Sequence, residues 1–184
     1  MNRIGRAMVI ALLAGFLPSI CFAQDAPRDS AQAMRDLRIT FLSASAASLG
    51  FKPTTEYPRV FGVVMDWPID DTTATIVSAL DGSASLYTTG TFGIIGGSGH
   101  ESVRMAAQRF VRTAEAHHDE ALRTRAYPYP AKGKVRFYFR TFQDVRVIET
   151  DAASAYSPSG RYSGLFRAGQ AVLTELRKVV EARR

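Results

Sequence analysis

Cysteine is almost absent from this chain, and its single cysteine, Cys21, lies near the N-terminus. One thiol excludes an intramolecular disulfide and a cysteine-ligated zinc site, because both need several cysteines. Histidine is also scarce, with three residues. Two of them, His117 and His118, are adjacent, so they would point about 100° apart on a helix rather than toward one ion. The sequence therefore predicts no metal site, and it contains no motif for a cofactor.

Long apolar runs are lacking as well, apart from one near the N-terminus. There, Arg3 and Arg6 precede an apolar stretch at 7–17. Cys21 and Ala23 then place small residues at the −3 and −1 positions of a cleavage site. This order is typical of a bacterial secretory signal peptide, and the stretch is shorter than the roughly 20 residues that a permanent membrane helix needs. We therefore expect a periplasmic or secreted protein without a permanent membrane span.

Removal of a signal peptide at 1–23 would leave a mature chain, 24–184, of 161 residues (184 − 23) without cysteine. This length fits one domain with a sizeable hydrophobic core. The formal net charge would fall from +6 to +4, because the leader holds two of the 23 basic residues and none of the 17 acidic ones. A mild positive charge in the periplasm favours a small anion or an anionic envelope component as partner, and not nucleic acid. Lipid attachment at Cys21 is the alternative fate of the leader.

Hydrophobic periodicity predicts an α+β fold with the order α-βββ-α-ββ-α. Apolar residues at helical spacing predict three helices, over 30–40, 99–123 and 163–182. Segments that alternate or are rich in β-branched residues predict five strands, over 59–67, 73–80, 83–89, 135–142 and 145–149. We expect a single domain in which the helices pack on one antiparallel sheet of about five strands. The mix of segments resembles roadblock-like and profilin-like folds with hairpin and meander exchanged in order, a likeness that implies no function.

Local signals refine this prediction. Asp81-Gly82 is typical of a type I′ hairpin turn. Pro68 is expected to end the strand that precedes it. Ser98 and Glu101 fit the S-x-x-E capping box at the start of the central helix. Each long helix is predicted to turn an apolar stripe toward the core, and these stripes include Leu122 on the first helix and Gly169 on the second.

The most unusual local sequence is a glycine-rich segment at 90–101, which leads into the central helix. Backbone N–H groups at the start of a helix favour a bound anion. The candidate ligand-binding residues are Gly96, Gly97, Ser98, Gly99 and His100. P-loop, dinucleotide-binding and nucleophile-elbow signatures do not match this segment. The alternative interpretation is a tight strand-to-helix turn in which glycines adopt positive φ.

Two segments, MDWPI at 65–69 and GGSGHESVR at 96–104, resemble a family of small uncharacterised bacterial proteins. The resemblance extends over most of the mature chain and implies a single domain. It brings no activity, ligand or catalytic residue with it.

Other groups of polar residues are weaker candidates for binding. Three aspartates lie within 66–71, but they lack the calcium-loop pattern, and turn formation explains them equally well. Basic residues alternate with tyrosines over 123–136, which suits either an anionic polymer or a solvated connector. On the strand that follows, one side is expected to present an exposed face around Tyr138 and Arg140.

These patterns support a binding or accessory module without catalysis, which acts through the glycine-rich segment or the sheet face. One alternative is a hydrolase-like enzyme that uses His100 with Ser98 or Asp66. Another alternative is a module for self-association into a homo-oligomer. Whether the protein is an enzyme stays open at this level.

Cleavage of the signal peptide should give a mature N-terminus at Gln24, and the exported protein should contain no thiol. The intact mass of the exported protein checks both statements. Retention of Met1, or a lipid on Cys21, would contradict them.

Overall fold

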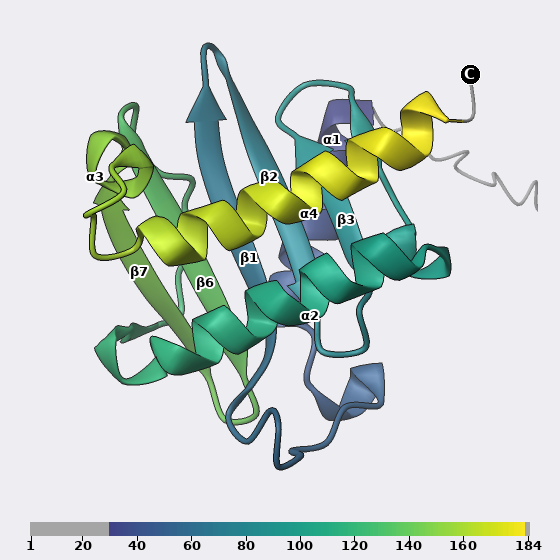
Figure 1. Cartoon of the computed structure of the whole chain (residues 1–184), viewed down its shortest axis with the longest axis vertical. Coiled ribbons are helices and arrows are strands. Elements are labelled where there is room, and N and C mark those ends of the chain that lie inside the picture. The colour runs from purple at the N-terminus through teal and green to yellow at the C-terminus, as the bar shows by residue number, and fades with distance from the viewer. Residues whose placement is uncertain (1–29, 183–184) are drawn as a thin grey trace, which may run out of the picture.

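The computed structural model describes residues 30–182 and has an antiparallel sheet at its centre (Figure 1). Its strands are β1 (Val60–Ile69), β2 (Thr72–Ala79), β3 (Ala84–Thr88), β4 (Gly93–Ile94), β5 (Leu122–Thr124), β6 (Lys134–Thr141) and β7 (Val145–Asp151). They lie in the spatial order β4-β3-β2-β1-β6-β7-β5. The predicted signal peptide lies outside the described residues.

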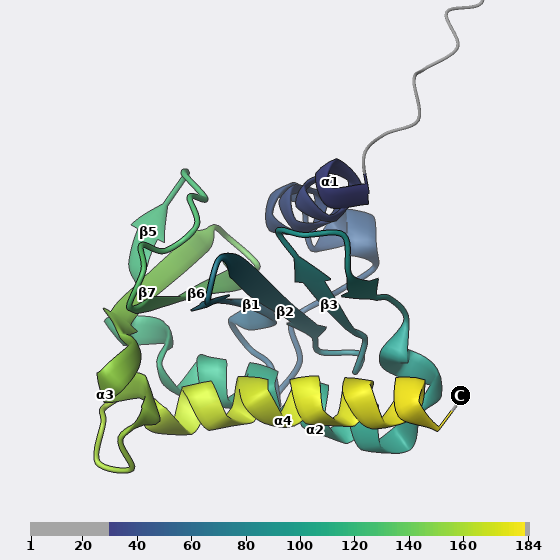
Figure 2. The ribbon, with the colours of Figure 1, turned by 90° about the horizontal axis from the view of Figure 1, so that it is seen from above.

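Helices cover both faces of this sheet. They are α1 (Ser30–Ser43), α2 (Glu101–Ala116), α3 (Ala152–Tyr156) and α4 (Ser163–Glu181). Figure 2 shows α2 and α4 side by side on one face, here called the helix face. On the opposite side, here called the second face, α1 and β5 rise above the sheet. The predicted α+β class and antiparallel sheet are confirmed.

The sheet has seven strands instead of the expected five or so, so the predicted element order was incomplete. Both additional strands, β4 and β5, are short edge strands. With two or three residues each, they are too short to show an alternating pattern in the sequence. The sequence pattern also missed α3, a single short helix between β7 and α4.

The central helix is shorter than predicted, because α2 ends at Ala116. The N–H of His117 donates to the carbonyls of Ala114 and Glu115 and closes its last turn. The chain then forms a 3₁₀ turn and enters β5, which pairs with β7. Leu122 is therefore 74% exposed on an edge strand, and its predicted place in the core was wrong. Its neighbour Ala121 is buried in the core instead.

The β2–β3 turn contains the expected left-handed glycine, but it is not type I′. Gly82 has φ +84°, whereas Asp81 is not among the described residues with positive φ. The N–H of Gly82 donates to Ala79 O (2.9 Å), and the N–H of Ala79 donates to Ser83 O (3.0 Å). These bonds define a three-residue loop with glycine at its left-handed position. The side chain of Asp81 accepts a bond from the Ser83 N–H and supports the turn.

Pro68 does not end β1, which continues to Ile69. Pro68 pairs with Thr73 of β2. The N–H of Thr73 donates to Thr89 Oγ1, and the carbonyl of Thr73 accepts a bond from the Thr89 N–H, so both groups point away from β1. The nitrogen of Pro68 therefore faces the side of β6, whose pairing with β1 already ends at Asp66. A proline is tolerated here because no ladder bond is lost.

The larger core lies between the sheet and the pair α2 and α4. Gly169 of α4 faces this core, as predicted, and lies in close contact with two side chains. A Cβ atom there would lie 2.6 Å from Met65 Cε and 3.1 Å from Phe110 Cζ. Glycine is needed because the helix meets both the central strand and the neighbouring helix at this point.

A buried ion pair joins α1 to the second face. Arg38 Nε donates to both carboxylate oxygens of Asp66 at 3.1 Å, and Nη2 contacts one of them more closely. The hydroxyl of Thr75 donates to the same carboxylate at 2.6 Å. The two charged side chains are 1% and 0% exposed. Burial raises the pKa of the Asp66 carboxyl, and the hydrogen bonds from Arg38 oppose that shift.

The left-handed glycines allow a matched test of the β2–β3 turn. Gly82 and Gly133 have similar φ, but a Cβ at Gly82 would lie 2.8 Å from Arg104 Cβ, whereas Gly133 faces open space. Gly133→Ala should cost about 1 kcal/mol from backbone strain alone. Gly82→Ala should cost about 2 kcal/mol or more, because overpacking adds to the strain. Urea unfolding measures both, and equal costs would contradict the contact with Arg104.

The ion pair allows a test of how α1 is held. Asp66→Ala should lower the free energy of unfolding by about 3–5 kcal/mol, because it leaves a buried guanidinium without its counter-charge. The double variant Arg38→Met, Asp66→Leu should cost much less, since it removes both charges and keeps the volume. Urea unfolding of the two variants is the measurement. A double variant as unstable as Asp66→Ala would show that packing, not charge, dominates here.

Candidate functional site

The glycine-rich segment forms a tight turn before α2. Gly96 has φ +82°, and a 3₁₀ turn follows at Gly97–Gly99. A Cβ at Gly97 would lie 2.6 Å from Leu176 Cδ2 and 2.7 Å from Val103 Cγ1. The positive φ therefore explains the glycine at position 96, and close packing explains the glycine at position 97. Gly99 faces open space and has no such constraint.

The predicted capping box is not formed at this turn. His100 occupies the N-cap position and makes no side-chain capping bond. The carbonyl of Ser98 accepts a bond from Arg104 Nη1 at 3.2 Å. The candidate residues from Gly96 to His100 lie together only as consecutive residues of one turn. Whether they bind an anion stays a prediction.

The structure does not bring His100 and Asp66 together as the hydrolase alternative requires. Asp66 lies on the second face, where Arg38 and Thr75 bond its carboxylate. His100 precedes α2, which covers the opposite face. The other two aspartates of the 66–71 cluster form the β1–β2 turn, so the three carboxylates do not gather at one site.

The adjacent histidines bond to neighbouring acids. His117 Nδ1 lies 3.1 Å from Glu120 Oε1, and His118 Nδ1 lies 2.8 Å from Asp119 Oδ1. Within residues 30–182, no three histidine, cysteine or acidic side chains are grouped as a metal site requires.

The segment at 125–133, here called the strap, packs against the second face. The ring of Tyr129 lies over the Arg38 guanidinium at 4.2 Å. Tyr127 meets Tyr138 edge-on at 5.9 Å, and Tyr138 Oη donates to Pro128 O at 2.6 Å. The two tyrosines of the strap are therefore half-buried against the sheet, whereas most of its other residues are exposed to solvent.

The sheet face that we expected to be exposed is covered. Tyr138 is 1% exposed beneath the strap, and Arg140 is 6% exposed. The alternation along β6 identified the side on which these residues lie. It could not show that the strap and α1 would cover that side.

Two adjoining hollows remain at the edge of the strap. The inner one, here called the Arg140 hollow, has a volume of about 330 Å³. Its polar lining includes Ser45, Thr124, Arg125, Tyr127, Arg140, Gln143 and Asp144. The outer hollow, of about 520 Å³, shares Thr124, Arg125, Gln143 and Asp144 and adds Arg123. Residues from three separate segments, 45–46, 123–127 and 140–145, thus line two hollows that share four residues.

Arg140 is a buried cation without a carboxylate partner among the described residues. Its Nη2 donates to Ala44 O, just beyond the end of α1, and its Cζ lies 5.3 Å from the ring centre of Phe61. Its Nε has no hydrogen-bond partner. Burial lowers the pKa of the Arg140 guanidinium, and only nearby Tyr127 opposes that shift. The guanidinium therefore lacks the acidic partner that buried charges normally have.

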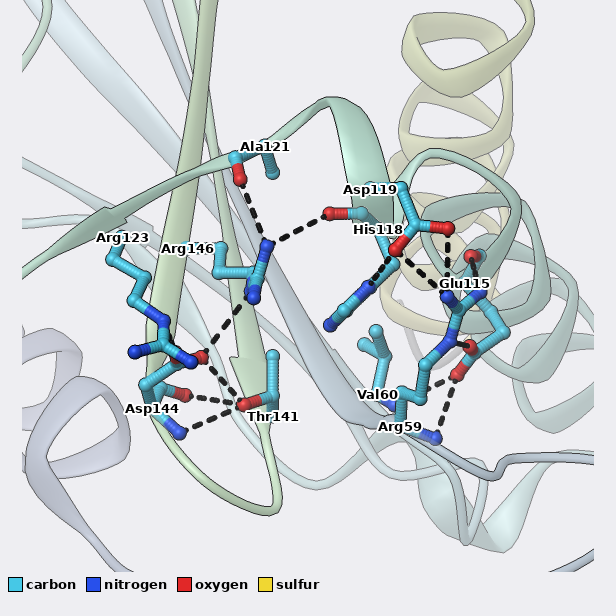
Figure 3. A network of polar contacts seen from close by, with 10 residues as sticks. All are labelled: Arg59, Val60, Glu115, His118, Asp119, Ala121, Arg123, Thr141, Asp144 and Arg146. Atoms are coloured by element: carbon cyan, nitrogen blue, oxygen red, sulfur yellow. Dashed lines mark hydrogen bonds and ion pairs between the residues drawn. The ribbon is translucent and has the colours of Figure 1, made fainter.

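A polar network fixes the wall of this hollow, as Figure 3 shows. Thr141 Oγ1 and the Asp144 backbone N–H are 2.8 Å apart, and Asp144 also contacts Arg123 Nε at 2.7 Å. Arg146 Nη1 donates to Ala121 O at 3.2 Å on the other side of Asp144. The single carboxylate of the hollow is thus held in place by its own partners.

The same network continues to the end of α2. Glu115 accepts bonds from the Val60 N–H (2.7 Å) and from Arg59 Nε (2.5 Å). Arg59 Nη1 also donates to Asp119 at 2.9 Å. Figure 3 shows these contacts beside the Asp144 cluster. They tie the start of β1 to the turn that leads into β5 and so position the hollow's rim.

The chain matches no protein-family model, no curated protein and no solved structure. None of the helices formed by residues 30–182 is long and apolar enough to cross a membrane.

Proposed function

We propose that this protein is an exported, non-catalytic module that binds a small anion or an anionic envelope component in the Arg140 hollow. The observation that carries the proposal is the buried guanidinium of Arg140, which lines the hollow and has no carboxylate partner among the described residues. Export follows from the leader sequence at 1–23.

The energetics of burial favour an anion at this position. A buried charge loses its hydration, and only a counter-charge or several hydrogen bonds offset that loss. The Ala44 carbonyl and the negative end of the α1 dipole offset part of it. An anion in the hollow would supply the rest through charge-assisted hydrogen bonds, which are stronger than neutral ones.

The charges around the two hollows point in the same direction. Arg123, Arg125 and Arg140 contribute three positive charges and Asp144 one negative charge, which gives a local net charge of +2. Arg123 is 71% exposed, and its ion pair with Asp144 can open at little cost. Arg125 makes no ion pair with any residue in the described range. Arg123 and Arg125 can therefore contact an anion at the exposed side of the hollows, and Arg140 can contact it at the buried side.

The lining of the hollows favours binding over catalysis. It contains no histidine, and its single carboxylate accepts a bond from the Thr141 hydroxyl and lies beside the half-buried Arg146. A general acid or base must be free to exchange a proton with the substrate. The hydrolase alternative also loses its pairing of His100 with Asp66.

Sulfate gives a sharp test, because it stays a dianion and arginine stays charged across the pH range used. The amides of 124–127 and 143–145 should shift on titration with sulfate, with the same affinity from pH 5 to pH 8. Higher salt should weaken binding. Arg140→Met should reduce the affinity at least tenfold, and so should Arg125→Met, which lies on the surface and leaves the fold intact. Arg177→Gln on α4 is the matched control, because it removes a surface charge far from the hollow.

The glycine-rich turn is the competing anion site, and the same titration separates the two. Binding there would shift the amides of Gly97 to Gly99. It would also weaken as pH rises from about 5 to about 8, where histidine loses its proton. Shifts confined to that turn, or no shifts at millimolar sulfate, would overturn the proposed site.

A further inference from the structure

We propose that the ligand is a phosphate monoester on a hydroxyl-bearing organic body, such as a sugar or polyol phosphate. This inference rests on the proposed function, because it concerns the chemical class of the anion in the same hollow. Three features of the hollow carry it: its charge, its size, and the side chains between its two ends.

The charge of the site selects a dianion. Three arginines and one aspartate give the lining of the two hollows a net charge of +2, and Arg146, whose Nε lies 3.5 Å from that aspartate, adds a further positive charge behind the wall. A phosphate monoester carries a charge of about −1.5 to −2 at neutral pH, with its second pKa near 6. A carboxylate or a phosphate diester carries only −1, and would leave one arginine charge uncompensated. Arginine forks also match phosphate oxygens in geometry.

The size of the site leaves room for a ligand larger than a bare ion. The inner hollow has a volume of about 330 Å³, and the outer one about 520 Å³. One water molecule occupies about 30 Å³ in the liquid. Inorganic phosphate would therefore fill a small part of the depression and leave the rest to water. A ligand with an organic body fills both hollows.

The lining indicates the nature of that body. Gln143 presents an amide group and Tyr127 an aromatic side chain, beside the apolar Ala46, Phe142 and Val145. The hydroxyls of Ser45 and Thr124 also line the hollow and already bond to nearby backbone groups. The side-chain amide of Gln143 is exposed and makes none of the described hydrogen bonds. Amide and hydroxyl groups suit the hydroxyls of a polyol, whereas an acyl chain would need a mainly apolar wall. The phosphate therefore lies at Arg140, and the hydroxyl-bearing part extends toward Gln143.

The test compares named probes by calorimetry with the purified exported protein. Glucose 6-phosphate and glycerol 3-phosphate should each bind at least tenfold more tightly than inorganic phosphate, and glucose should not bind. Their affinity should rise from pH 5 to pH 7.5 as the second phosphate proton leaves, because the arginines do not titrate in this range. Vesicles that contain phosphatidic acid distinguish a lipid headgroup from a soluble ester, and retention on them would assign the phosphate to a lipid and overturn the polyol body.

Two variants separate the parts of the ligand. Gln143→Ala should weaken glucose 6-phosphate three- to tenfold and leave inorganic phosphate unchanged, because the amide contacts only the organic body. Arg125→Met should weaken both probes, and Arg177→Gln should weaken neither. If sulfate and phosphate bind at the hollow but the esters bind no more tightly, this inference fails and the proposed function stands. If no anion binds there, both fail.

Discussion

The second face of this protein depends on one interaction, the buried ion pair between Arg38 and Asp66. Asp66 lies on β1, the strand that pairs with both β2 and β6. Arg38 reaches it from α1 and, in addition, donates to Tyr127 O at 2.9 Å and stacks beneath Tyr129. One guanidinium thus connects a helix, a strand and the strap, three segments that are far apart in sequence. A second, smaller hydrophobic cluster also lies on this face, so the ion pair acts together with apolar packing of α1 and the strap.

Arg140 shares this face with Arg38 but differs from it in one respect. Both side chains are almost fully buried, yet only Arg38 has a carboxylate partner among the described residues. A fold can accommodate a buried cation by an internal counter-charge or by one supplied from outside. The first solution fixes α1 and the strap. The second solution leaves a cationic position beside a depression, which is the physical basis for a binding role.

The sequence predicted the parts of the fold whose signals are local. Five strands and the last helix lie close to their expected positions, because alternation and helical periodicity persist over many residues there. The central helix was predicted too long, because Ala121 and Leu122 continue its apolar spacing although the chain has already turned at His117. Edge strands of two or three residues carry no periodic signal at all. A positive φ was correctly expected at Gly82, although the turn around it is not of the predicted type I′.

The candidate site was harder to predict, because it is built from distant segments. Ser45, Thr124, Arg140 and Gln143 have no common motif, and they are brought together by the pairing of β5 with β7 and by the bond from Arg140 to the Ala44 carbonyl. The alternation along β6 showed that Arg140 lies on the second face, but it did not show that this face is covered. The glycine-rich turn attracted attention because its composition is unusual, whereas Gly96 and Gly97 are explained by backbone conformation and packing.

The pairing of β1 with β6 also determines when this fold can form. Val60 pairs with Thr141, so the centre of the sheet joins residues from opposite halves of the described chain. Contacts between such distant residues form slowly, because closing the long loop between them costs entropy before any stabilising contact has formed. The sheet cannot be completed until β6 is available, and α4 must follow to cover it. Slow closure of this kind delays folding of a newly made chain, which would be compatible with the export proposed above.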